Sequence, residues 1–200
     1  MESLAVEIRV ACMSGHVEAG LALYRAGAPG QAAKHLLHPV SEMHQAERAG
    51  IDALGFEEQI FKSVSAALEA GKSASDASIE EMLQQADANI ALIQKNAGGE
   101  TNEIITYLME QVINEYNIGV KAGQNTDAGE YLDAFGFALV ALKMAKRTAA
   151  EEKAVPPLIS ELNKLVARWP EGGPLADAVP TSKTEGIAQA VSVMKTLEGN

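Results

Sequence analysis

Residues 101–120 read TNEIITYLMEQVINEYNIGV, and this stretch decides the fold class. Its apolar side chains recur every three or four residues, which is the spacing of one face of an α-helix. The apolar stripe is wide, so we expect the helix to contact more than one neighbour. The stripe is formed by Ile104, Ile105, Leu108, Met109, Val112, Ile113, Tyr116 and Val120.

The same helical spacing covers most of the chain on both sides of this stretch. Alanine, leucine, glutamate and lysine dominate, and no alternating run of β-branched residues occurs. We predict an all-α fold, an antiparallel helical bundle of roughly seven to nine helices. We expect a single domain over 1–200, with a Pro- and Gly-rich connection over 168–182. The predicted helices cover about 2–26, 31–38, 41–54, 60–71, 79–98, 101–120, 127–152, 156–168 and 184–197.

The composition excludes several classes of function. The formal net charge is −11 and the pI about 4.8, which argues against nucleic acid or an anionic membrane surface as a partner. An acidic protein of this kind can instead attract cations. Cys12 is the only cysteine, so an intrachain disulfide and a cysteine-based zinc site are excluded. No run of 18 apolar residues occurs, so we expect no membrane insertion.

The first residues lack a basic start followed by an apolar stretch, so we expect no signal peptide in this chain. A periplasmic location is then expected only if the chain is a mature form whose leader has been removed. The alternative location is the cytoplasm.

All four histidines lie between residues 16 and 44, which makes this region the first place to look for a chemical site. Imidazole is the commonest protein metal ligand. His44 and Glu47 are three residues apart, so both project from one face of the predicted helix 41–54. A nitrogen and an oxygen ligand at this spacing can meet one cation. Mixed ligation suits iron, zinc or copper better than calcium.

His35 and His38 have the same separation on the preceding short helix. The first helix, which carries His16, must fold back near them if 27–30 forms a tight turn. Glu42 follows His38 by four residues and is either a further ligand or an acceptor that fixes an imidazole tautomer. In order of preference, the predicted metal ligands are His44 and Glu47, then His16 and His38, then His35, with Glu42 as an addition.

A structural interpretation of the same residues stays open. Histidine–glutamate pairs occur on helix surfaces without any metal. A histidine before a proline, as in His38-Pro39, often lies at a helix C-terminus, where the helix dipole favours it.

The motif His44-x-x-Glu47 in an acidic, all-helical chain resembles the HxxE motif of the imelysin-like (M75) family. That family consists of periplasmic helical-bundle proteins linked to iron uptake. It usually has a glycine two positions before the histidine, where this chain has Glu42. The resemblance covers a few residues of one helix. It implies binding of a metal ion, or less readily of haem, a periplasmic address and no peptidase activity.

Residues 20–27 (GLALYRAG), followed by Ala32, Ala33 and Leu36, are similar to a tetratricopeptide helical hairpin. The proline that normally ends such a unit is absent at the matching place, where His44 stands, and no second copy occurs. This similarity implies an alternative function, a protein–protein interaction module whose hairpin at 16–38 binds a protein or peptide partner.

Glu115 and Glu130 lie on successive predicted helices. They are either a carboxylate pair that completes a metal site or part of a solvated face with tyrosines at its edge. A ferritin-like di-iron centre is disfavoured, because no glutamate lies three residues before any histidine. No phosphate-binding loop or serine hydrolase motif is present. We therefore expect a non-enzymatic metal-binding bundle, with iron, zinc or copper favoured over haem.

Overall fold

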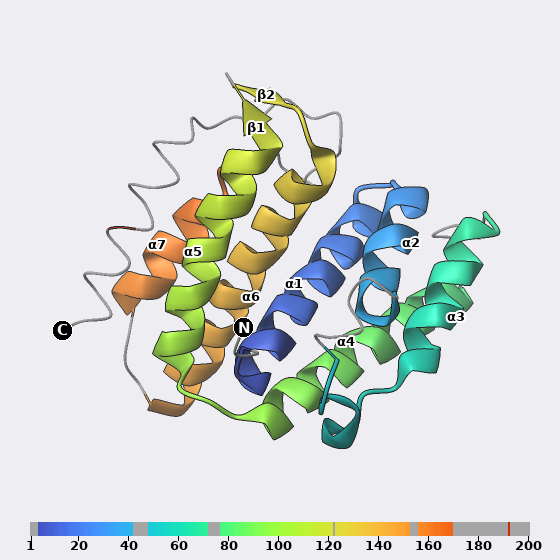
Figure 1. Ribbon diagram of the computed structural model, residues 1–200, viewed down its shortest axis with the longest axis horizontal. Coiled ribbons are helices and arrows are strands. Elements are labelled where there is room, and N and C mark those ends of the chain that lie inside the picture. Colours follow the sequence, from blue (N-terminus) through green and yellow to red (C-terminus); the bar gives the residue numbers. More distant parts are fainter. Residues whose placement is uncertain are drawn as a thin grey trace. The chain divides into compact units, whose positions relative to one another are not determined.

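The computed structural model describes residues 4–41, 48–71, 77–121, 123–152, 156–169 and 192. Over these residues the chain forms seven α-helices and one very short β-hairpin (Figure 1), so the all-α prediction is confirmed. Contacts group the chain into two compact units, residues 1–98 and residues 99–200, which we describe separately. The single domain expected from the sequence stays a prediction. Within the described ranges, no helix is both long enough and apolar enough to cross a bilayer.

The first unit is built around its first helix, α1, drawn in blue in Figure 1. Helix α1 packs against α2 and α4, while α3 packs against α2 and α4. The core between these helices is apolar and fully buried, with Leu21, Leu23, Leu36 and Phe61 among its largest side chains. The helices span Val6–Arg25 (α1), Pro29–Leu37 (α2), Glu58–Glu69 (α3) and Ala77–Ala97 (α4), with short 3₁₀ helices η1 (His38–Val40) and η3 (Asp52–Leu54).

The glycine–proline segment after α1 forms the tight turn that the sequence predicts. Gly27 has a φ of +83°, a left-handed conformation that favours glycine, and its N–H donates to the carbonyl oxygen of Tyr24. Helix α2 begins at Pro29, two residues before the predicted start at Gln31. The reason is that proline is well suited to the first turn of a helix, where its missing N–H leaves no bond unmade.

The predicted helix over 41–54 is not borne out where the structure describes it, and residues 42–47 lie outside the described residues. From Arg48 to Leu54 the chain forms a turn followed by η3, and Gly50 and Gly55 both have positive φ. Helix α4 holds the end of this segment. The Asn89 side chain donates to the Gly55 carbonyl oxygen (2.9 Å) and accepts from the Glu57 N–H (3.1 Å).

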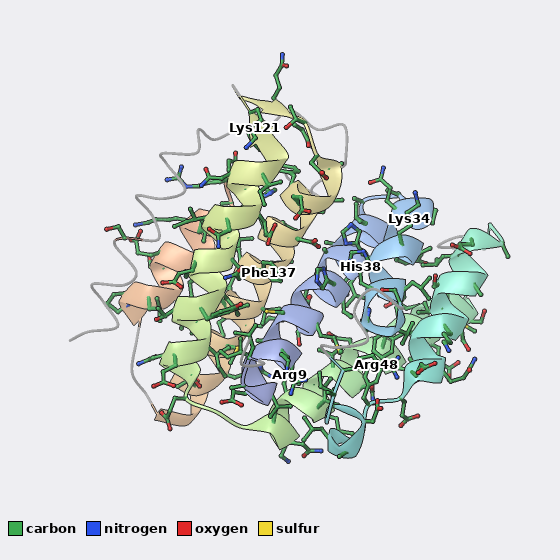
Figure 2. All side chains as sticks on the ribbon, viewed as in Figure 1. Arg9, Lys34, His38, Arg48, Lys121 and Phe137 are labelled. Atoms are coloured by element: carbon green, nitrogen blue, oxygen red, sulfur yellow. The ribbon has the colours of Figure 1, made fainter. Side chains whose placement is uncertain are left out.

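Two arginines fasten the same segment to its surroundings (Figure 2). Arg9 of α1 donates to the carbonyl oxygen of Ala49 at 2.6 Å. The Arg48 guanidinium forms an ion pair with Glu58 at 2.6 Å and lies 5.7 Å from the ring centre of Phe56. Hydrogen bonds to Lys62 and Arg48 lower the pKa of Glu58. Side-chain bonds, several of them from distant parts of the chain, thus hold this segment in place of the backbone hydrogen bonds of the expected helix.

The second unit consists of α5 and α6, which pack side by side along their lengths, and of α7, which packs against α6. A β-hairpin with strands of two residues each joins α5 to α6, and Val120 pairs with Asn125. The Asp127 carboxylate accepts from the N–H of Gly129 (3.0 Å) at the start of α6, as the sequence predicts. The elements span Thr101–Gly119 (α5), Val120–Lys121 (β1), Gln124–Asn125 (β2), Ala128–Glu152 (α6) and Pro156–Val166 (α7).

Four aromatic side chains form the core at one end of this unit. Trp169 contacts the rings of Tyr116, Tyr131 and Phe135, with ring centres 5.7, 6.1 and 5.6 Å away. All four side chains are buried. Apart from residue 192, the predicted helix 184–197 lies outside the described residues, and so does the predicted connection beyond Trp169.

Gly119, the last residue of α5, lies close to the backbone at the start of α6, which gives a first prediction. A methyl group at this position would lie 2.6 Å from the Tyr131 nitrogen and 3.0 Å from the Asp127 carbonyl oxygen. Both are backbone atoms that cannot rotate away. Gly119→Ala should therefore lower the free energy of unfolding by about 1–3 kcal/mol or more, as overpacking does, measured by urea denaturation.

Gly129→Ala, in the first turn of α6, is the matched control. Its added methyl would contact only the Asp127 side chain, at 3.3 Å. It should change stability by less than about 1 kcal/mol, and an equal loss in both variants would contradict the prediction.

Candidate metal centre

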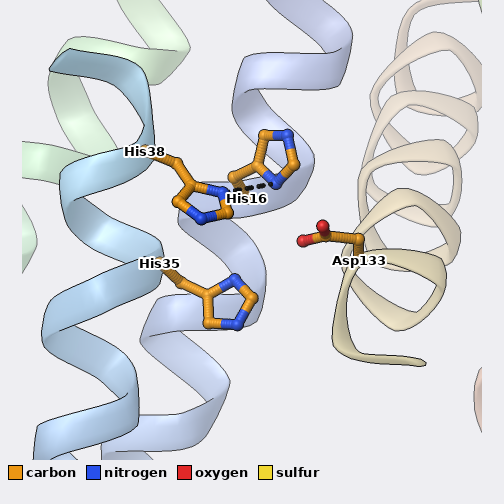
Figure 3. A group of neighbouring side chains, drawn as sticks. All are labelled: His16, His35, His38 and Asp133. Carbon is orange, nitrogen blue, oxygen red and sulfur yellow. Dashed lines mark hydrogen bonds between the residues drawn. The ribbon is translucent and has the colours of Figure 1, made fainter. Parts of the chain in front are cut away.

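The structure brings together three of the four histidines predicted as ligands. His16 projects from α1, His35 from α2, and His38 from the junction of α2 and η1 (Figure 3). One ring nitrogen from each lies within 4.8 Å of those of the other two. His35 is buried, and His16 and His38 are half-buried. Asp133, which Figure 3 also draws, belongs to the second unit and is described with it below.

The closest pair in this group is His16 and His38. Their Nδ1 atoms are 3.1 Å apart, at hydrogen-bond distance, so one ring donates and the other accepts. The ring centres are 4.6 Å apart for this pair and 5.1 Å apart for His35 and His38. Two nitrogens that bind one tetrahedral zinc ion at the usual 2.0–2.1 Å are about 3.3 Å from each other. The observed separation is therefore close to the one that coordination requires.

Both histidine-bearing helices are held in place from behind. Helix α1 is fixed to α4, because the Gln94 side chain donates to the Ser14 hydroxyl (2.8 Å), two residues before His16. Helix α2 is fixed to α3, because the Ser65 hydroxyl donates to the Ala33 carbonyl oxygen (2.9 Å), two residues before His35. These bonds fix the helices from which His16 and His35 project.

His38 lies where α2 ends, as expected for a histidine before a proline. The Ser41 N–H and hydroxyl both donate to the His38 carbonyl oxygen, at 3.2 and 3.1 Å. This turn stops the helix and fixes the backbone from which the His38 ring projects. The position of His38 at the end of α2 agrees with the structural interpretation of this histidine. Its contact with His16 agrees equally with a role as a metal ligand.

The remaining predicted ligands cannot be placed in this geometry. His44, Glu47 and Glu42 all lie in 42–47, outside the described residues. The group that the structure supports therefore consists of His16, His38 and His35, which the sequence ranked below His44 and Glu47.

In the second unit, the structure brings Glu115 and Glu130 together, the pair that the sequence marked. Their side chains share a hydrogen bond, and two carboxyl groups can do so only when one of them carries a proton. Burial raises the pKa of Glu115 to about 8, with further contributions from Glu130 and from the charge of Asp133. Nearby like charges and lost hydration both favour the neutral form.

The tyrosines next to these glutamates lie in the core, whereas the sequence placed them at the edge of a polar face. Tyr116 and Tyr131 are buried, with ring centres 5.9 Å apart. Burial raises the pKa of Tyr131, and Tyr116 adds to this effect. Sequence reasoning also missed Asp133, a buried carboxyl whose signal is a single acidic residue within the apolar run 131–138.

Comparison with known proteins adds no relative. No family model matches the chain, and no curated protein and no solved structure matches it. The resemblance to the imelysin-like family, carried by His44 and Glu47, therefore stays a prediction.

The raised pKa of Glu115 gives a second prediction. Between its usual value of 4.5 and about 8, the folded protein holds a proton that the unfolded chain releases. The contribution of this proton to stability is complete below about pH 4.5 and is lost as the pH rises through about 8. The side chain in Glu115→Gln cannot lose a proton. The free energy of unfolding of this variant should therefore vary less between pH 5 and 9 than that of the wild type.

Urea denaturation at several pH values measures this difference. Glu103→Gln is the control, since it removes an exposed carboxyl from the same helix. If the free energy of unfolding varies with pH in the same way for the wild type and for Glu115→Gln, Glu115 is an ordinary solvated acid.

Proposed function

We propose that the first unit binds a divalent transition-metal ion through His16, His35 and His38, and that its role is metal handling without catalysis. The observation that carries this proposal is the convergence of three imidazole nitrogens within 4.8 Å, from two helices and the turn that ends one of them. Two other features support it: the supporting bonds behind α1 and α2, and the net charge of −11, which favours cations near the protein.

The donor set narrows the class of metal. Three neutral imidazoles suit zinc, copper and iron, whereas calcium and magnesium prefer oxygen ligands. Affinity should fall below about pH 6, because protons then compete with the metal for the ring nitrogens. Iron uptake in the periplasm and haem binding rest on the imelysin resemblance alone, and both remain narrower versions of this proposal.

Metal titration of the natively purified, untagged protein is the direct test. Wild-type protein should bind Zn²⁺ near one equivalent in a calorimetric titration. His16→Ala and His38→Ala should each weaken binding by on the order of 100-fold, since each removes one ligand from a small set. Lys34→Ala, which truncates an exposed side chain on the same helix as His35, should bind like the wild type.

The same titration on His44→Ala tests the first choice of ligand made from the sequence. A loss equal to that of His38→Ala would add His44 to the set. A wild-type protein that neither contains nor takes up Zn²⁺, Cu²⁺ or Fe²⁺ would falsify the proposal. The helical interaction module would then be the remaining interpretation.

Thermal unfolding provides an independent readout. Metal bound only by the folded protein stabilises it by mass action, about 2.7 kcal/mol at a free concentration 100 times Kd. The melting temperature should therefore rise with added Zn²⁺, return to its starting value with a chelator, and stay constant in the His16→Ala variant. An equal rise in His16→Ala would place the bound metal elsewhere.

A further inference from the structure

Helices α1 and α2 approach each other closely at Gly20, a glycine next to the histidine group. A methyl group on Gly20 would lie 2.8 Å from Leu36 Cγ, 3.2 Å from Leu36 Cδ2 and 3.2 Å from the Leu36 backbone nitrogen. Gly20 lies inside α1 and has an ordinary helical conformation, so its backbone does not require glycine. Glycine inside a helix costs about 1 kcal/mol relative to alanine. What Gly20 provides in return is space.

That space lies beside the candidate ligands. Gly20 follows His16 by four residues, so both lie on one face of α1. Leu36 lies between His35 and His38 on α2, and its side chain is fully buried. The contact between Gly20 and Leu36 therefore sets how near the α2 histidines come to His16.

We propose that Gly20 is a positioning residue for the metal site, because it permits the approach of α1 and α2 that brings the His16 and His38 nitrogens to coordinating distance. This inference rests on the proposed function. Gly20 touches no metal. It acts through Leu36 and the backbone of α2.

Adding one methyl group should open the site. Leu36 has no solvent to move into, and its backbone nitrogen at 3.2 Å cannot rotate away. Relief then comes from a small outward shift of α2, which carries His35 and His38 away from His16. Metal–ligand bonds tolerate changes of only about 0.2 Å, so a shift of a few tenths of an ångström weakens coordination.

The experiment compares two glycine-to-alanine variants. Gly20→Ala should bind Zn²⁺ at least tenfold more weakly than the wild type, the lower end of the loss typical for supporting residues. Gly30→Ala is the matched control, because it lies in α2 and a methyl group there has nothing within 4 Å. It should bind like the wild type. Affinity is measured by competition with a chromogenic chelator, at a temperature where circular dichroism shows all variants folded.

Two further readouts separate positioning from general destabilisation. Co²⁺ absorption reports ligand geometry, so its visible bands should shift or weaken in Gly20→Ala and stay unchanged in Gly30→Ala. The double variant Gly20→Ala/Leu36→Ala removes the side-chain part of the clash. It should bind more tightly than Gly20→Ala and approach Leu36→Ala, although both variants carrying Leu36→Ala are less stable.

The outcomes distinguish the two proposals. If the wild type binds no metal, the proposed function fails, and the role of Gly20 fails with it. If the wild type binds but Gly20→Ala binds as tightly as Gly30→Ala, the metal site stands and the positioning role is overturned. If Gly20→Ala does not fold, the double variant decides. Zn²⁺ affinity below that of Leu36→Ala supports positioning, because the added methyl group still lies 3.2 Å from the backbone nitrogen of residue 36, and affinity equal to that of Leu36→Ala overturns this role.

Discussion

Helix α1 approaches α2 closely where the Gly20 backbone faces Leu36, and the first unit depends on the packing of this helix pair. Two helices normally keep their axes 8–10 Å apart because side chains stand between them. A glycine removes one of those side chains and lets the opposing leucine rest on the helix backbone. Helix α2 in turn carries α3, and α1 carries α4, so the first unit is assembled around this pair. His16, His35 and His38 lie on these two helices and at the end of α2. The packing of the two helices therefore determines the distances between the three rings.

Helix periodicity explains how much of this fold could be predicted. The stripe of residues 101–120 and the breaker at 27–30 gave helices within a few residues of those observed, because strong apolar patterns and glycine or proline stops act locally. The segment before Gly55 was predicted wrongly. The end of this segment is held by Asn89, which lies 34 residues beyond Gly55. The Asn89 side chain forms hydrogen bonds with the Gly55 carbonyl oxygen and the Glu57 N–H. The hairpin at 120–125 was missed because two-residue strands carry no period.

The candidate site shows the same limit more sharply. Clustering in the sequence pointed to the region where the structure brings three histidines together, and spacing placed His35 and His38 on one helix face. Spacing within a helix says nothing about the distance between helices, however. That distance is set by Gly20, whose role has no signal beyond its cost in a helix. The sequence therefore ranked the pair His44 and Glu47 first, since both lie on one predicted helix, and ranked below it the three residues that the fold brings together.

The weakness of the His16–His38 hydrogen bond bears on how this pair would bind a metal in the proposed function. Their mutual hydrogen bond keeps the two rings close, and its net contribution to stability is only about 1 kcal/mol, as for most such bonds. A metal at a free concentration 100 times its Kd would stabilise the folded protein by about 2.7 kcal/mol. While this hydrogen bond is present, one Nδ1 carries the proton and the other accepts it. The proton then occupies the space that an ion would need. In the proposed function, coordination would replace this hydrogen bond, which holds the two Nδ1 atoms 3.1 Å apart, close to the separation that an ion requires.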